Sequence, residues 1–305
     1  AYSSSGFYFN WLIENKINYN TVINEDHSIN AVLVQSAQKE TYKGDNVTAT
    51  DFPNDYIQTI SGGTVIKGAS DKTQWSIASY LARVQYSYKG KYMASGAISA
   101  DGSSRFGKNN RWGYFPSASL AWRVSGEDFF TKAKFLSFVD DLKIRTSYGV
   151  TGNFQIGNYD HLSLMALDNY ILGTGNGQLV QGYKPNTIKN DDLSWEKNAM
   201  VNVGVDLQMF KGLLGITVDY YNTNTSNMLL NVPVPHLTGY STALMNIGKV
   251  NNRGWEIALT SQKNFTKDFG YSFNANYATN TNEVKALGPG NAPIISTGSV
   301  CLLYT

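Results

Sequence analysis

The stretch from 75 to 125 constrains the fold most, because it holds three long runs in which apolar and polar residues alternate strictly. Apolar residues occupy nearly every second position of 80–88, 92–100 and 114–124. A period of two indicates strands that have one apolar and one polar face. Each run is longer than the roughly 5–6 residues of an ordinary sheet strand. The runs match the about 9–11 residues that a tilted strand needs to cross a bilayer.

The composition favours the same kind of sheet. Charged residues make up 16% of the 305 residues, aromatic residues 13%, and the mean hydropathy is −0.29. Ordinary soluble proteins contain roughly 25% charged residues. The sequence has no apolar run of the about 18 residues that a transmembrane helix requires. A polar average with membrane-length alternation is expected for a membrane barrel, because half of each strand faces water.

Further runs of this kind predict about twelve strands in one antiparallel sheet. Ten are expected at 7–19, 28–42, 74–89, 90–102, 112–125, 141–151, 193–209, 213–230, 251–263 and 270–284, and two short ones near 162–166 and 178–183. The connections alternate between short ones at 20–27, 89–91, 210–213 and 264–269 and long ones at 43–73, 152–192, 231–250 and from 285 onward. Two connections of moderate length are the exceptions, 103–111 on the long side and 126–140 on the short side, and a short helix is expected in the second. Short periplasmic turns and long extracellular loops are typical of an up-and-down outer-membrane barrel.

The alternation also predicts which face each residue occupies. Arg83, Gln85 and Arg123 are expected to line the lumen, and the lipid face is expected to carry Tyr80, Val84, Leu120 and Trp122. Aromatic residues near strand ends predict a girdle at the level of the lipid headgroups: Tyr88, Tyr92, Trp112, Tyr114, Trp122, Trp195, Tyr220 and Tyr271. The alternative is that tyrosine is simply favoured in strands.

No catalytic, cofactor-binding or metal site is expected, and the sequence predicts that the protein is not an enzyme. The three histidines, His27, His161 and His236, lie far apart, and the single cysteine, Cys301, rules out a disulfide within the chain. Acidic pairs at 25–26, 140–141 and 191–192 are better explained by turns than by glycosidase chemistry. A calcium site within residues 152–192 is an alternative that the sequence leaves undecided, although this segment contains no EF-hand-like loop. The net charge of +2 gives no argument for nucleic-acid binding.

Three tyrosines in the expected external loops are candidate substrate-binding residues. They are Tyr170, Tyr183 and Tyr240. Exposed aromatic rings can stack on sugars or contact a second protein. Packing within the loops themselves is the alternative explanation.

Four blocks of the sequence resemble one known family. They are residues 79–130, the segment DLKIRTSYGVTGN at 141–153, residues 193–230 and residues 232–262. Together they resemble the C-terminal barrel of SusC/RagA-type TonB-dependent transporters from the outer membranes of Bacteroidetes. The barrel of this family has about 22 strands, and the resemblance implies that residues 1–305 are part of one such barrel domain. Nothing in the sequence resembles a plug domain, a TonB box or a signal peptide, so we interpret the chain as a fragment of a longer protein.

The resemblance implies active import of a bulky nutrient, an oligosaccharide or a peptide. A SusD-like surface lipoprotein would deliver the nutrient, and the TonB complex would supply energy through the missing N-terminal part. A passive porin or structural barrel is the main alternative, and an upstream plug domain would distinguish the two. An outer-membrane enzyme would need a catalytic constellation that the sequence lacks. A soluble β-sandwich is a further alternative, and it predicts that the fragment remains in solution without detergent.

Overall fold

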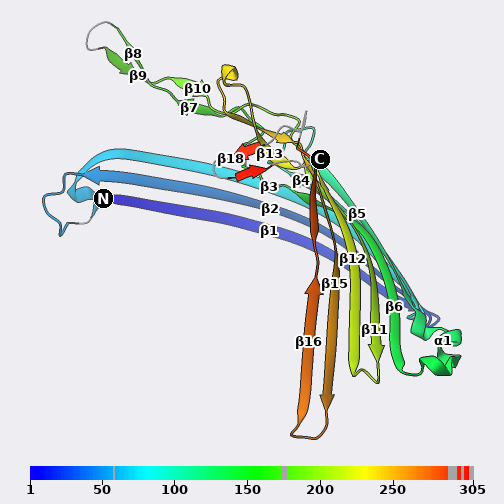
Figure 1. The fold of residues 1–305 in the computed structure, drawn as a ribbon. Coiled ribbons are helices and arrows are strands. Elements are labelled where there is room, and N and C mark those ends of the chain that lie inside the picture. The colour runs from blue at the N-terminus through cyan, green and yellow to red at the C-terminus, as the bar shows by residue number, and fades with distance from the viewer. Residues whose placement is uncertain (58, 174–176, 288–293, 297–298, 302–305) are drawn as a thin grey trace.

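A single large antiparallel sheet dominates the computed structural model, which describes residues 1–57, 59–173, 177–287, 294–296 and 299–301 (Figure 1). Eleven strands form this sheet: β1 (Tyr2–Ile23), β2 (His27–Thr50), β3 (Thr64–Tyr88), β4 (Tyr92–Ser103), β5 (Trp112–Arg123), β6 (Val139–Asn153), β11 (Glu196–Met209), β12 (Leu214–Ser226), β15 (Lys249–Asn264), β16 (Gly270–Ala278) and β17 (Thr281–Ala286). From β1 to β16 each strand pairs with the next strand of this sheet, and β17 pairs with β15 beside β16.

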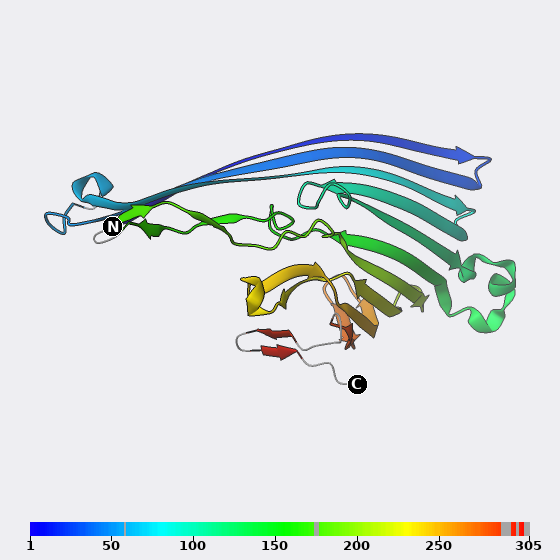
Figure 2. The same ribbon diagram turned by 90° about the horizontal axis from the view of Figure 1, so that it is seen from above.

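The sheet curves into part of a barrel wall, with one concave and one convex face (Figures 1 and 2). This confirms the predicted fold class, an all-β, antiparallel, up-and-down partial barrel. Among the described residues, no helix has the length and apolar character to cross a membrane.

Short turns connect the strands at one rim. The tight turns at 24–26, 89–91 and 210–213 contain consecutive residues with positive φ, such as Lys89 (52°) and Gly90 (62°). Such turns match the twist of the flanking strands. The turn at 265–269 joins β15 to β16 at the same rim. The longest connection at this rim, 124–138, holds the expected short helix α1 (Asp128–Lys132) between the 3-10 turns η2 (Val124–Gly126) and η3 (Lys134–Leu136).

Long connections lie at the opposite rim. Residues 51–63 contain η1 (Ile60–Gly62), and 227–248 contain β13 (Leu229–Pro233), η4 (His236–Thr238) and β14 (Thr242–Asn246). The connection from β6 to β11 contains β7 (Met165–Leu167), β8 (Tyr170–Leu172), β9 (Gln178–Val180) and β10 (Tyr183–Pro185). Because β7 pairs with β10 and β8 with β9, these strands form one projecting ribbon, here called the rim ribbon (165–172 and 178–185; Figure 1, top). A last hairpin is formed by β18 (Ile294–Ser296) and β19 (Ser299–Cys301). The predicted sorting of short and long connections is thus confirmed up to residue 287, whereas the long connection predicted from 285 onward lies largely outside the described residues.

Three strand predictions need correction. Residues 43–50 and 64–73 are not loop but continue β2 and β3, from Tyr42 opposite Thr73 to Thr50 opposite Thr64, with one register shift between Thr48 and Ala49. Beyond the membrane both faces of a strand contact water, so the apolar alternation that marks the strand is lost. Short strands are present near 162–166 and 178–183, as β7 and β9, but they belong to the rim ribbon and not to the wall. The strand expected at 270–284 is divided at Thr279, whose backbone N–H and hydroxyl both bond to the backbone of Trp255.

A buried aromatic cluster joins the long connections to the wall. Phe106, Phe115, Leu193 and Trp195 form its centre, and Phe154 packs against it. The strand alternation places Phe115 on the same side of β5 as Arg123, the lumen side. The prediction that Trp195 belongs to an interfacial girdle is therefore wrong, since this residue is only 3% exposed. Its ring lies over Phe106 and Phe154, and its Nε1–H donates to the carbonyl of Arg111.

Candidate functional site: the lumen-facing charge network

The pairing register assigns the two faces of the wall. Across β4, Arg83 aligns with Ser117 of β5, and Gln85 aligns with Ser119. Both serines lie on the same face of β5 as Arg123, so all of these residues are on one face of the wall. The opposite, convex face carries large apolar side chains that no other part of the described chain covers. Three of them, Tyr80, Val84 and Leu120, are 52%, 51% and 60% exposed. The structure therefore places the predicted lumen and lipid residues on opposite faces, as expected.

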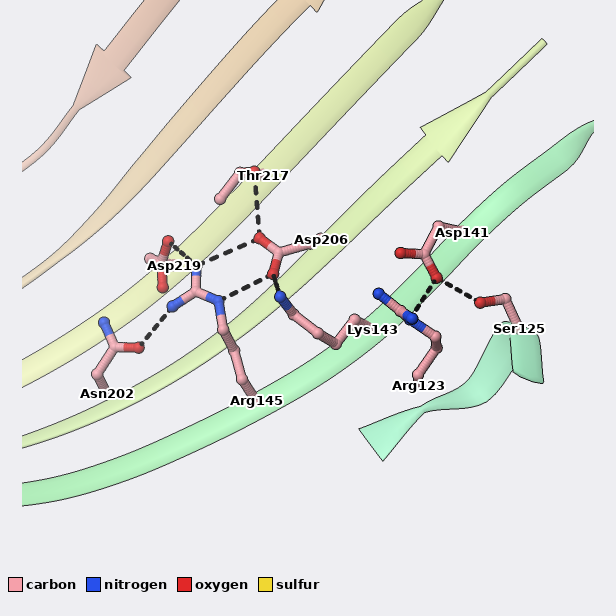
Figure 3. A network of polar contacts seen from close by, with 9 residues as sticks. All are labelled: Arg123, Ser125, Asp141, Lys143, Arg145, Asn202, Asp206, Thr217 and Asp219. Carbon is pink, nitrogen blue, oxygen red and sulfur yellow. Dashed lines mark hydrogen bonds and ion pairs between the residues drawn. The ribbon is translucent and has the colours of Figure 1, made fainter. Parts of the chain in front are cut away.

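The most connected polar group on the lumen face is a network of ion pairs across β6, β11 and β12 (Figure 3). Arg145, Gly204 and Asp219 stand side by side in one row of the three strands. The Arg145 guanidinium reaches over β11, and its Nη2 donates to Asp219 Oδ2 at 2.6 Å. A Cβ atom at position 204 would lie 2.7 Å from Arg145 Cζ and 2.5 Å from Asp219 Oδ1. Glycine at position 204 therefore leaves the space through which the guanidinium passes.

The next row of the network contains Lys143, Asp206 and Thr217. Lys143 Nζ lies 3.0 Å from Asp206 Oδ2, which also accepts from Arg145 Nε at 3.1 Å. The Thr217 hydroxyl donates to the other carboxylate oxygen at 3.2 Å. Asn202 completes the group by accepting from Arg145 Nη1 at 3.4 Å. Both carboxylates of the network are thus held by cations from β6.

A further ion pair continues the network toward the short-turn rim. Arg123 Nε lies 3.2 Å from Asp141 Oδ1, the same oxygen that accepts from the Ser125 hydroxyl at 2.5 Å. Across β5, β6, β11 and β12, three cations therefore balance three carboxylates. Asp219 Oδ1 is buried and has no hydrogen-bond partner within the described part of the chain. Paired charges thus join four neighbouring strands on the polar face of the wall.

Shallow recesses flank the network on the lumen face. One, of about 310 Å³, lies over Gly215 and Ala258 and is bordered by Asp141, Asp206 and Thr260. The other, of about 380 Å³, lies over small polar side chains of β2 to β5, among them Ser28, Ser87, Ser95 and Ser119. Both are open; the first is lined mainly by polar groups and the second by a mixture of polar and apolar ones.

The structure divides the three candidate tyrosines between two connections. Tyr170 and Tyr183 lie on the rim ribbon and are 50% and 66% exposed. Tyr240 lies between η4 and β14, and its backbone N–H donates to the Thr238 hydroxyl at 3.4 Å. No ring contact joins the three among the residues that the structure describes. Their role in substrate binding stays a prediction.

Two of the three histidines, and the acidic pairs, have local partners. His27 Nδ1 lies 2.7 Å from the Tyr86 hydroxyl, and His161 Nδ1 lies 3.0 Å from the carbonyl of Arg105. His236 begins η4. Two of the acidic pairs contribute turn or rim ion pairs, from Asp26 to Lys89 and from Asp191 to Lys189. In the described ranges no three His, Cys, Asp or Glu side chains come together as a metal site would require.

Sequence reasoning missed the network itself and one further cation. The guanidinium of Arg105 lies over the rings of Trp75 and Phe154, with its Cζ 5.0 Å and 5.3 Å from the ring centroids. Its Nε donates to Asn158 at 3.0 Å, so Arg105 holds the base of the β6–β11 connection against β3. Period-two alternation assigns these residues to a face but does not say which residues of neighbouring strands are opposite one another.

Comparison with known proteins agrees with this geometry. Residues 2–297 match the family model "TonB dependent receptor-like, beta-barrel". TonB-dependent receptor P39 of Formosa agariphila is 37% identical over 283 residues, covering 92% of this chain and 26% of that protein. TonB-dependent receptor SusC of Bacteroides thetaiotaomicron is 33% identical over 221 residues, covering 72% of this chain and 22% of that protein. This chain therefore spans about a quarter of the curated relatives that it matches.

A solved structure, that of the RagAB peptide transporter, superimposes on the chain with a TM-score of 0.89 at 26% identity. The match covers 99% of this chain and 33% of that one. The family consists of receptors and not of enzymes, in agreement with the sequence prediction. The chain belongs to the TonB-dependent receptor-like β-barrel family, and it forms part of an outer-membrane barrel wall that is similar to those of SusC and RagAB.

Proposed function

We propose that the full-length protein imports a bulky nutrient, an oligosaccharide or a peptide, across the outer membrane with energy from the TonB complex. The observation that carries this proposal is the match to the RagAB peptide transporter along 99% of the chain. The relatives named TonB-dependent receptors support the same energy source. In this proposal the described residues supply part of the wall, the polar lumen face and the long external connections.

We infer that a SusD-like surface lipoprotein contacts the long-loop rim, and the rim ribbon supports this. Leu167, Ile171 and Leu179 are 63%, 70% and 69% exposed, although the ribbon projects beyond the wall (Figure 1). Exposed apolar side chains that gather in a water-facing segment are typical of protein–protein contact sites. Tyr170 and Tyr183 on the same ribbon would then contact either the nutrient or the lipoprotein.

Replacing Tyr170, Tyr183 and Tyr240 together with alanine should lower nutrient uptake at least about tenfold, equivalent to about 1.4 kcal/mol of lost binding. The rate would be measured in a deletion strain complemented with the full-length gene and supplied with labelled oligosaccharides and peptides. Tyr19→Ala is the matched control, because Tyr19 is 59% exposed and lies at the opposite rim. Unchanged uptake at equal surface abundance would remove these tyrosines from the binding site.

The proposed energy source has its own test in the same strain. Collapse of the proton-motive force should abolish uptake by the unmodified protein. Uptake that continues without the proton-motive force would support a passive pore and contradict active import, whatever the tyrosine variants do.

A further inference from the structure

An apolar groove runs along the convex face of the wall near the short-turn rim. Its volume is about 360 Å³, and its lining is almost entirely apolar. Ala94 of β4 forms the floor, in the same row as Tyr86 of β3 and Leu120 of β5. The next row toward the short-turn rim is bulky and consists of Tyr88, Tyr92 and Trp122. A small residue among large ones thus creates the groove, which lies on the face exposed to lipid.

The groove is bounded at its rim end by polar groups of the aromatic residues. Trp122 Nε1 donates to Glu127 Oε1 at 3.1 Å, and Lys91 Nζ lies 3.5 Å from the other oxygen of Glu127. Hydrogen bonds from Tyr92 and Trp122, with Lys91 close by, hold the pKa of the Glu127 carboxyl below its usual range. Indole and phenol groups that are apolar on one side and hydrogen-bonded on the other are typical of the headgroup level of a bilayer. The groove therefore begins at the headgroup level and extends into the apolar layer.

The connection directly below the groove carries exposed aromatic and basic residues. This segment, 124–138, joins the ends of β5 and β6 and projects on the convex side of the wall (Figure 2). Phe129 and Phe135 are 61% and 77% exposed. Lys132 and Lys134 are also exposed, and neither forms an ion pair with any residue that the structure describes. Exposed phenylalanines beside free lysines are typical of segments that lie in a membrane interface and contact anionic headgroups.

From these observations we propose that the groove and the 124–138 segment together bind one phospholipid of the periplasmic leaflet. One acyl chain lies in the groove over Ala94, between Tyr86 and Trp122. The phosphate lies at the headgroup level, where Lys132 and Lys134 provide the positive charge. The apolar lining of the groove matches an acyl chain. Lys132 and Lys134 belong to the segment at the rim end of the groove, where the phosphate of such a lipid would lie.

The test uses the full-length protein, purified from native membranes in a mild detergent and examined by native mass spectrometry. We expect one phospholipid to remain bound to each barrel. Ala94→Phe should fill the groove and lower the retained lipid at least about fivefold. Ala275→Phe is the matched control, because Ala275 is an exposed alanine on the lipid face of β16, opposite Leu259 and away from the groove. This control should keep the lipid.

A second variant tests the headgroup contact without touching the wall. Lys132 and Lys134 lie outside the strands. Replacing both with glutamine should therefore leave folding unaffected, even if the Ala94→Phe protein fails to assemble. This double variant should also lower lipid retention at least about fivefold. The proposal is overturned if no lipid stays bound to the unmodified protein, or if the lysine double variant and the Ala275→Phe control retain equal amounts of lipid. It is also overturned if Ala94→Phe converts a dimer to a monomer at unchanged lipid content, because a second copy of the barrel would then occupy the groove.

Discussion

Replacing Trp195 with alanine is expected to destabilise the barrel by about 3–5 kcal/mol, the usual cost of removing a large aromatic side chain from a core. The ring lies 5.3 Å, between ring centroids, from each of Phe106, Phe115 and Phe154, and the side chain is 3% exposed. The substitution also leaves the carbonyl of Arg111 without its indole donor. The free energy of unfolding would be measured by urea titration of the full-length protein in detergent micelles.

The control for this prediction is Trp112→Ala. Trp112 lies on β5 near the same rim but is 47% exposed, so its loss should cost much less. Hydrogen exchange should also become faster in residues 154–164 of the Trp195 variant, because the aromatic cluster holds this connection to the wall. Equal destabilisation by the two substitutions would contradict the role assigned to the cluster.

Arginine in place of Val84 is expected to impair membrane assembly by about 2–4 kcal/mol, the cost of a cation on the lipid face at mid-depth. Val84 is 51% exposed on the convex face, in a row with Gly96 of β4 and Ala118 of β5. No carboxylate lies in that row to receive the charge. The folded fraction would be measured after refolding of the full-length protein into lipid vesicles.

Gln85→Arg is the matched control, because position 85 follows 84 on the same strand but faces the lumen, opposite Ser95. A cation there remains in a polar environment, so assembly should be close to that of the unmodified protein. If both arginine variants assembled equally well, the assignment of the two faces would be wrong.

The wall could be predicted from the sequence because period-two alternation is a local property. Each apolar face in 80–88, 92–100 and 114–124 follows from the sequence of one strand, without knowledge of its neighbours. The outer parts of β2 and β3 could not be predicted in this way. In the outer part of β2, polar residues occupy both faces of the strand, Lys43 and Asp45 on one and Asn46 and Thr48 on the other, and only the pairing with β3 shows that they belong to a sheet.

The lumen network could not be predicted because it depends on register. Arg145 and Asp219 are separated by 74 positions in the sequence and meet only because Gly204 stands between them in the same row. The sequence assigns Trp195 to the girdle for a related reason. A tryptophan at a strand end can turn to lipid or to the lumen, and the choice depends on Phe106 and Phe154 from other connections. The external tyrosines remain predictions, since their role depends on a nutrient and a partner.

The central claim is that one face of this sheet contacts lipid and the other faces the lumen. The most direct measurement is a spin-label scan of positions 79–88 in the full-length protein in lipid vesicles, after removal of the native cysteines, Cys301 among them. Accessibility to oxygen should be high at the even positions, including Tyr80, Val84 and Tyr86, and accessibility to a water-soluble nickel reagent should be high at the odd ones. Oxygen and nickel accessibilities that change together along the strand, without a period of two, would contradict the claim.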